Sequence, residues 1–153
     1  MPDEPLFERI DTVILRVRDY EAAADWYADR LGLQPLHTDP VEGLVVLPFD
    51  GHSLTLWQLK AGETLPPRGT CVPFPIFVTA DAAALHAELQ ERDVTVDQLQ
   101  EGGGVRSFTF WDLDGNRLEA CQVLVGRGAA RGALGLQSTS GAASDQEPEE
   151  ASQ

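Results

Sequence analysis

The sequence consists of two similar halves. An apolar run ending in Arg18-Asp19 leads into an Ala-rich segment, and a second apolar run ending in Ala80-Asp81 leads into another, with the aspartates 81 − 19 = 62 residues apart. Each half later reaches an Asp-Gly turn, Asp50-Gly51 and Asp114-Gly115, and these are 114 − 50 = 64 residues apart. Recurrence at a fixed spacing indicates one supersecondary unit used twice. Two such units, related by a pseudo-twofold axis, would form a concave space between them.

Composition and charge limit the possible functions. With 153 residues, 42% of them hydrophobic and 24% charged, the chain is long enough for one domain with a substantial core. No apolar run is long enough to cross a bilayer, and the first residues lack the pattern of a signal peptide, so we expect a cytoplasmic protein. The net charge of −14 would repel the phosphates of nucleic acids and anionic membranes, so neither is an expected partner.

The first half is predicted to be a β-α-β-β-β unit over residues 10–60, preceded by an arm over residues 1–9. Alternating Val13, Leu15 and Val17 predict a strand, and Asp19 and Gly32 are suitable residues to begin and end a helix. The expected elements are strand Thr12–Arg18, helix Tyr20–Leu31, and strands Leu33–Thr38, Gly43–Leu47 and Ser53–Leu59.

The second half is predicted to repeat this order over residues 71–125, after a Pro- and Gly-containing linker over residues 61–70. The expected elements are strand Cys71–Thr79, helix Ala82–Arg92, a short strand Thr95–Leu99, and strands Arg106–Trp111 and Arg117–Leu124. Cys71 and Cys121 both lie in apolar segments, and we expect both thiols to be buried. Residues 126–153 are rich in Gly, Ala, Ser, Gln and Glu without an aromatic residue, which predicts a disordered acidic tail.

Several motifs occur in an order typical of one known family. They are Ile10–Asp19, Trp26-Tyr27 and Leu31-Gly32-Leu33 in the first half, and Ile76–Asp81 and Asp112–Glu119 in the second. Over about residues 10–124 the chain resembles the glyoxalase/bleomycin resistance protein/extradiol dioxygenase family, the vicinal oxygen chelate (VOC) superfamily, although Leu113 stands where the family usually has proline. The resemblance implies an α+β fold in which two tandem βαβββ modules form an open, barrel-like cup.

The resemblance also implies where a metal ion would bind. In metal-dependent members each module supplies two ligands, and the corresponding positions here are Thr12 and Phe74, which are 62 apart, and Thr55 and Glu119, which are 64 apart. First-row divalent metals bind through imidazole, carboxylate or thiolate groups, so Glu119 is the one suitable residue of the four. The sequence therefore predicts neither a metal site nor another cofactor. The three histidines, none of which has a paired ligand in the cup, are His37, His52 and His86.

Alternate residues of the strands predict the lining of the cup. Ile14, Ile76 and Val78 on this face are expected to be core residues, and Trp26, Tyr27 and Trp111 are expected to be packing residues. Trp57 and Phe74 either line a ligand or fill the space as core, because large aromatic side chains serve both purposes. Glu119 should pair with Arg16 or Arg117; alternatively, it stays partly free to hold a cationic or hydroxylated ligand or to act as a base. The six ligand-binding candidates are Thr12, Arg16, Thr55, Trp57, Phe74 and Glu119.

Three functions follow from this interpretation. The favoured one is a protein of the bleomycin-resistance type that binds a small organic molecule in an aromatic-lined cup without a metal ion. The second is an enzyme of the same superfamily, a lyase, epimerase or dioxygenase, with Glu119 as the candidate catalytic base. The third is a scaffold without a ligand that functions through association. A homodimer is the expected assembly in each case.

Overall fold

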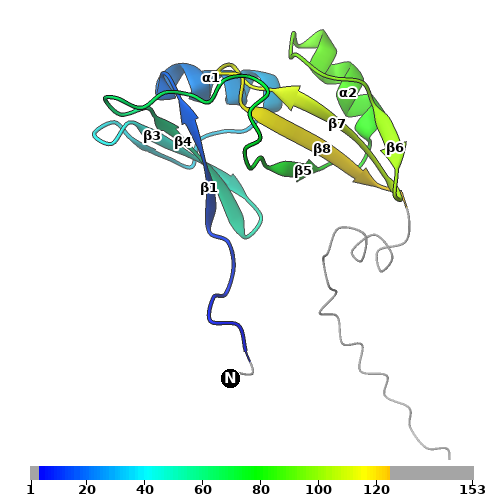
Figure 1. Cartoon of the computed structure of the whole chain (residues 1–153), viewed down its shortest axis with the longest axis horizontal. Coiled ribbons are helices and arrows are strands. Elements are labelled where there is room, and N and C mark those ends of the chain that lie inside the picture. Colours follow the sequence, from blue (N-terminus) through cyan, green and yellow to red (C-terminus); the bar gives the residue numbers. More distant parts are fainter. Residues whose placement is uncertain (1–3, 125–153) are drawn as a thin grey trace, which may run out of the picture.

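A computed structural model of the chain describes residues 4–124 and contains two four-stranded sheets and two helices (Figure 1). The predicted α+β fold with two βαβββ modules is confirmed, and the sheets are not closed into a barrel. Residues 125–153, which include the predicted tail, lie outside the described part of the chain. The elements are β1 (Thr12–Val17), α1 (Tyr20–Leu31), β2 (His37–Asp39), β3 (Leu44–Phe49), β4 (His52–Gln58), β5 (Ile76–Val78), α2 (Ala82–Glu91), β6 (Gln100–Gly102), β7 (Val105–Trp111) and β8 (Arg117–Val123).

The two sheets have the same topology. The strand order is β1-β4-β3-β2 in the first sheet and β5-β8-β7-β6 in the second, and in each the first strand pairs in parallel with the last. Ile14 lies opposite Thr55 in the first sheet, and Ile76 lies opposite Glu119 in the second. These pairs differ by 76 − 14 = 62 and 119 − 55 = 64 residues, so the spacings found in the sequence are the spacings of the structural repeat.

Both helices begin where the sequence predicted. The Asp19 carboxylate accepts hydrogen bonds from the backbone N–H groups of Glu21 and Ala22, and Asp81 caps α2 through Ala84. Gly32 ends α1 with a φ of 70°, in the left-handed region that glycine adopts without a steric cost.

Each helix covers one face of its sheet. Both helices lie on the same side of the pair of sheets (Figure 1). The side chains that point toward the helices are buried. In the first half they include Leu15, Val17, Leu54 and Leu56 of β1 and β4, and in the second half Phe108, Phe110 and Leu118. The alternate residues of these strands lie on the opposite side, which no helix covers; we call this side the open face. The open face includes the positions predicted to line a cup.

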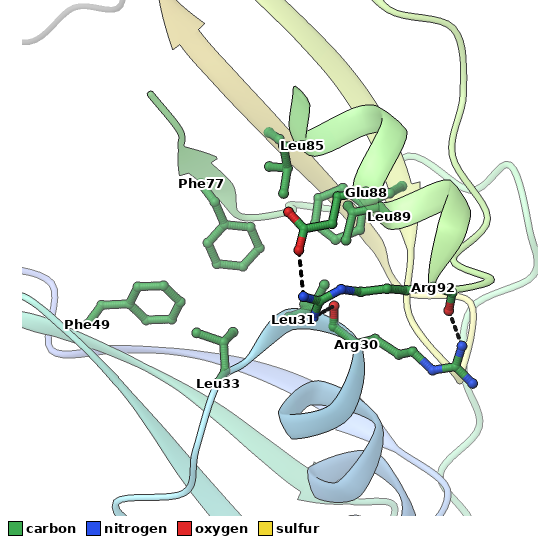
Figure 2. Close-up of a pocket in the computed structure, with 11 residues that line it drawn as sticks. Arg30, Leu31, Leu33, Phe49, Phe77, Leu85, Glu88, Leu89 and Arg92 are labelled. Atoms are coloured by element: carbon green, nitrogen blue, oxygen red, sulfur yellow. Dashed lines mark hydrogen bonds and ion pairs between the residues drawn. The ribbon is translucent and has the colours of Figure 1, made fainter. Parts of the chain in front are cut away.

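The two modules meet at the ends of the helices. The Arg30 guanidinium donates to the Arg92 carbonyl, and the Arg92 guanidinium donates at 3.2 Å to the Arg30 carbonyl (Figure 2). Arg30 and Arg92 are 92 − 30 = 62 residues apart, so these reciprocal bonds relate equivalent positions of the repeat. The Phe49 and Phe77 rings also stack across the junction, with centroids 5.3 Å apart.

A buried polar contact closes the other side of the junction. The Tyr27 hydroxyl, which is fully buried, donates at 2.8 Å to Oδ2 of Asp112 in the turn between β7 and β8. Asn116 donates through its side chain to the same carboxylate at 2.9 Å and to the Arg16 carbonyl at 3.0 Å. Trp26, adjacent to Tyr27, is partly buried against the core, so both residues pack as expected, with Tyr27 the one fully buried.

Three predicted strands differ from the observed ones by more than two residues at an end. The second strand is His37–Asp39, whereas Leu33–Thr38 was predicted. The fifth strand is Ile76–Val78, shorter than the predicted Cys71–Thr79, because Pro73 and Pro75 lack the N–H groups that donate hydrogen bonds between strands. Thr95–Leu99 is not a strand: Val96 makes a single bridge to Phe110, and the edge strand β6 begins at Gln100. The edge strand β6 is instead formed by Gln100–Gly102, directly before the turn at Gly103 and Gly104.

The predicted segment boundaries at residues 9, 60, 70 and 125 stay predictions, although β1–β4 and β5–β8 lie within the ranges given for the two modules. Among the described residues, neither helix has the combination of length and apolar character that crossing a lipid bilayer requires.

Candidate functional site

Four of the predicted site residues form a group on the first sheet. The hydroxyls of Thr12 and Thr55 are 2.8 Å apart and hydrogen-bonded, and Thr55 is almost completely buried. The Arg16 guanidinium is paired with Glu63 and lies 5.1 Å from the centroid of the Trp57 ring. The indole N–H of Trp57 donates to the Glu42 carbonyl at 3.0 Å, which fixes the ring.

The other two predicted residues lie on the second sheet. The Arg117 guanidinium lies 4.0 Å from the centroid of the Phe74 ring and 3.7 Å from the Glu119 carboxylate. Glu119 therefore pairs with Arg117, one of its two predicted partners, whereas Arg16, the other, pairs with Glu63 and makes no ion pair with Glu119 in the described part of the chain. Within residues 4–124, no hydrogen bond or ion pair joins these two residues to the group on the first sheet.

Three residues expected in the core are exposed instead. Ile14, Ile76 and Val78 are 46%, 51% and 80% exposed. They lie on the open face, and one chain supplies a helical layer only to the opposite face of each sheet. The expectation was wrong because sequence alternation identifies two faces of a strand but not which of them a single chain covers.

A large cavity lies on the open face of the second sheet. Its volume is about 510 Å³, and one wall is the segment from Leu65 to Phe74, which connects the two modules. The other wall includes Thr109, Trp111 and Arg117 of β7 and β8. We call this space the linker cavity. Trp111, which was expected only to pack, lines it, and Cys71, expected to be buried, is an exposed residue of its linker wall.

A smaller polar cavity adjoins the linker cavity. It has a volume of about 250 Å³, and Asp97, Thr109 and Arg117 line both spaces. Glu119 lines the polar cavity together with Gln98, Gln100 and Ser107. The predicted residues Phe74 and Glu119 are therefore brought to two adjoining cavities, whereas Thr12, Arg16, Thr55 and Trp57 line neither.

A third cavity lies at the junction of the modules, on the side that carries the helices. It has a volume of about 200 Å³, and leucine and phenylalanine side chains from both modules surround it, with Arg30, Glu88 and Arg92 at one end (Figure 2). Its arginines are already bonded to Glu88 and to backbone carbonyls. None of the predicted site residues lines this space.

The four positions implied for metal ligands do not fit a divalent metal. Thr12 and Thr55 are bonded to each other, Phe74 has no donor atom, and Glu119 faces Arg117. In the part of the chain that the structure describes, no three His, Cys, Asp or Glu side chains come together in a way that could hold an ion. One carboxylate is too few donors for a stable site.

The remaining polar groups have structural contacts. A ring nitrogen of His52 lies 2.8 Å from the Ile10 carbonyl, and one of His86 lies 2.7 Å from the Asp97 carbonyl. Cys121 is buried on the open face, and desolvation, followed by the charge of Glu119, raises the pKa of its thiol. A thiol that keeps its proton is a weak nucleophile, so Cys121 has no chemical activation here.

Sequence reasoning missed the contribution of the linker. Arg68, a linker residue, lies with its guanidinium 5.3 Å from the centroid of the Trp111 ring. The only sequence signal was the position of an arginine within a Pro- and Gly-rich segment, which says nothing about the sheet that the segment crosses. The contact between Tyr27 and Asp112 was missed for a similar reason, because their 85-residue separation gives no local pattern.

The comparisons agree on family and fold. The family model of the Glyoxalase/Bleomycin resistance protein/Dioxygenase superfamily matches residues 9–120. No curated protein matches. One similar solved structure is TnmS3, an antibiotic binding protein from Streptomyces sp. CB03234, with 27% identity, a TM-score of 0.63, and coverage of 78% of this chain and 99% of that chain.

Two further solved structures show the same fold at lower identity. Lactoylglutathione lyase from Agrobacterium tumefaciens has 22% identity and a TM-score of 0.58, with 77% of this chain and 96% of that chain covered. A glyoxalase family protein from Enterococcus faecalis has 20% identity and a TM-score of 0.63, with 76% of this chain and 99% of that chain covered.

Proposed function

Because the chain belongs to the glyoxalase/bleomycin resistance protein/dioxygenase superfamily, we propose that it binds a small organic molecule on the open face of its sheets, without a metal ion. The linker cavity is the observation that carries this proposal. Its volume of about 510 Å³ is within the range of small-molecule sites, roughly 300–1,000 Å³. Phe74 and Trp111 provide aromatic surface, and Thr109 and Arg117 provide a few polar groups beside it.

The donor atoms favour binding over metal-assisted chemistry. A Lewis-acid site needs several imidazole, carboxylate or thiolate groups, and the corresponding positions hold two threonines and a phenylalanine beside Glu119. Glu119 as a general base is also disfavoured, since its carboxylate already faces the Arg117 guanidinium at 3.7 Å. The antibiotic binding protein among the similar structures supports the same choice.

We further propose that the working form is a homodimer. The exposed Ile14, Ile76 and Val78 lie along β1 and β5, and each of these strands is paired on one edge only. A second copy would remove this apolar surface from water and deepen the space beside the linker cavity.

Native mass spectrometry of the full chain, purified without added metal, tests the proposal. We expect a dimer mass carrying a non-covalent organic molecule or, if the ligand is lost during purification, a dimer that binds members of an aromatic natural-product panel in calorimetry. Replacing Phe74 by Leu should weaken that binding, whereas Phe7→Leu in the arm should not, because Phe7 is 84% exposed and lines neither cavity on the open face.

Two results would contradict the proposal. One is a stoichiometric transition metal that is retained through dialysis and lost in Glu119→Gln. The other is binding that is unchanged in Phe74→Leu, which would place the ligand outside the linker cavity.

A further inference from the structure

The cations of the open face lie on aromatic rings. Four cation–aromatic contacts occur within residues 4–124, and all four belong to side chains of the open face or its linker. Arg16 and Lys60 lie over Trp57 in the first sheet, with Lys60 Nζ 4.8 Å from the ring centroid. Arg68 lies over Trp111 and Arg117 lies over Phe74 beside the linker cavity. A chain with only 11 lysines and arginines and a net charge of −14 thus gathers four cations on one face.

The two arginines of the linker cavity, Arg68 and Arg117, differ in whether their guanidinium groups have a carboxylate partner. Stacking occupies the flat face of a guanidinium and leaves its in-plane N–H groups to donate hydrogen bonds. Arg117 has a distant partner in Glu119, at 3.7 Å. Within residues 4–124, Arg68 has no carboxylate within 4.0 Å and no side-chain hydrogen bond.

Three carboxylates also line the adjoining cavities, and they must be weighed against the arginines. Asp114 accepts from the Arg18 guanidinium at 3.1 Å, so its charge already has a partner, and Glu119 faces Arg117. The Asp97 carboxylate accepts a backbone hydrogen bond from Gln98 at 2.8 Å. Of the two arginines that line the linker cavity, Arg68 is thus the one without an ion pair or a side-chain hydrogen bond within residues 4–124.

We propose that the ligand of the linker cavity is a flat aromatic molecule with a carboxylate group, and that Arg68 and Arg117 donate hydrogen bonds to this carboxylate. The inference rests on the proposed binding function and specifies its ligand class. A guanidinium binds a carboxylate through two parallel N–H···O bonds, a geometry that fixes the plane of the ligand. The adjacent Phe74 and Trp111 then supply apolar contact for the ring system. The proposed ligand is therefore an anion, whereas the sequence analysis considered a cationic ligand held by Glu119.

Three naphthalene derivatives of similar shape test the charge: naphthalene-2-carboxylate, the neutral naphthalene-2-carboxamide and the cationic 2-naphthylmethylammonium. Binding to the full chain is measured by calorimetry and by quenching of tryptophan fluorescence. We expect the carboxylate to bind most tightly. Arg68→Gln should weaken carboxylate binding by roughly tenfold to a hundredfold and carboxamide binding much less, since only the carboxylate carries a negative charge opposite the guanidinium.

Arg106→Gln is the matched control, because Arg106 lies in the same sheet, is paired with Glu101 at 2.7 Å and lines neither cavity on the open face. Arg68 is in an exposed linker, so its replacement should leave the thermal unfolding midpoint unchanged. Arg117→Gln should also weaken carboxylate binding selectively.

The outcomes separate this inference from the proposed function. Equal binding of the carboxylate and the carboxamide, or preference for the ammonium compound, would overturn the carboxylate as the ligand class. The proposed binding function would still stand if Phe74→Leu weakens the binding of these compounds. Unchanged carboxylate binding in Arg68→Gln would also overturn it. If none of the three compounds binds, and the purified protein carries no organic molecule, both the ligand class and the binding function are contradicted.

Discussion

Single residues at the module junction have roles that their type alone does not indicate. Tyr27 lies in a helix and fills the core, but its hydroxyl also reaches the turn of the other module through Asp112. Burial is the main cause that raises the pKa of Asp112, and the hydrogen bonds from Asn116 and Tyr27 act in the opposite direction. Burial, followed by the charge of Asp112, raises the pKa of Tyr27 well above its usual range, so Tyr27 remains a donor. One helix residue thus stabilises the ionised form of a carboxylate in the other half.

Replacing Tyr27 by Phe should lower the free energy of unfolding by about 1–3 kcal/mol at neutral pH, because Asp112 Oδ2 loses one of its donors. A raised folded-state pKa means that the contribution of Asp112 to stability is full below its unfolded pKa and declines as pH rises through the folded pKa. Tyr27→Phe raises that pKa further and extends the decline to higher pH, so the difference from wild type should be smaller in acid than at neutral pH.

Denaturant unfolding of both proteins across this pH range gives the measurement. Tyr20→Phe is the control, since its hydroxyl makes one long bond of 3.4 Å to Glu21, and its effect should be within about 0.5 kcal/mol. A cost of Tyr27→Phe that is constant with pH would contradict the assigned role of the hydroxyl.

Elements repeat more faithfully than the contacts between them. The two helices begin at equivalent aspartates, Asp19 and Asp81, but Asp19 accepts two backbone hydrogen bonds and Asp81 accepts one from the helix that it caps. At the junction, one side is closed by Tyr27 and Asp112, while the side near Phe49 and Phe77 retains a cavity (Figure 2). The two modules therefore share strand order and register, whereas the side chains at the two sides of the junction make different contacts.

The two N-caps provide a matched pair of variants. Asp19→Ala should lower the free energy of unfolding by about 1–2 kcal/mol and Asp81→Ala by about 0.5–1 kcal/mol, because fewer donors of α2 depend on their cap. Chemical denaturation of the two single variants and the double variant gives these values. The reverse order, or no loss in either variant, would show that the caps do not control the helix starts.

At the scale of the whole molecule, the open face is the feature that one chain leaves incomplete. The sheets lie beside each other with their helices on the same side (Figure 1), so apolar residues on the opposite side stay exposed. We have proposed that a second copy of the chain covers these residues in a homodimer.

Val78→Glu should prevent this association, because a carboxylate would have to be desolvated in the interface. Val41→Glu is a control of the same chemistry: Val41 is 91% exposed but lies in the turn between β2 and β3. Light scattering coupled to size exclusion should give a dimer for wild type and Val41→Glu and a monomer for Val78→Glu. A monomeric wild type, or a dimer in all three proteins, would contradict the assignment of this surface.

Local patterns predicted most of the fold. The helix over Tyr20–Leu31 was predicted at its observed bounds because its start and end are determined by neighbouring residues, Asp19 and Gly32. The edge strands β2 and β6 were misplaced because an edge strand depends on the pairing that its neighbour offers, and Thr95–Leu99 makes only one bridge. The predicted strand Cys71–Thr79 contains β5 but is too long, because Pro73 and Pro75 lack N–H donors. Among the six candidate site residues, Phe74 and Glu119 line cavities on the open face. The four on the first sheet do not; they are Thr12, Arg16, Thr55 and Trp57.

The sequence by itself determined the repeat, the family resemblance and the identity of the residues at the four positions where a metal would bind, because these are facts about residue type and spacing. Only the tertiary structure decided which face of each sheet is covered, which arginine pairs with Glu119, and that the linker crosses the second sheet with Arg68 over Trp111. These outcomes depend on contacts between residues far apart in the chain. Such contacts have no local signature, since packing rather than sequence spacing selects them.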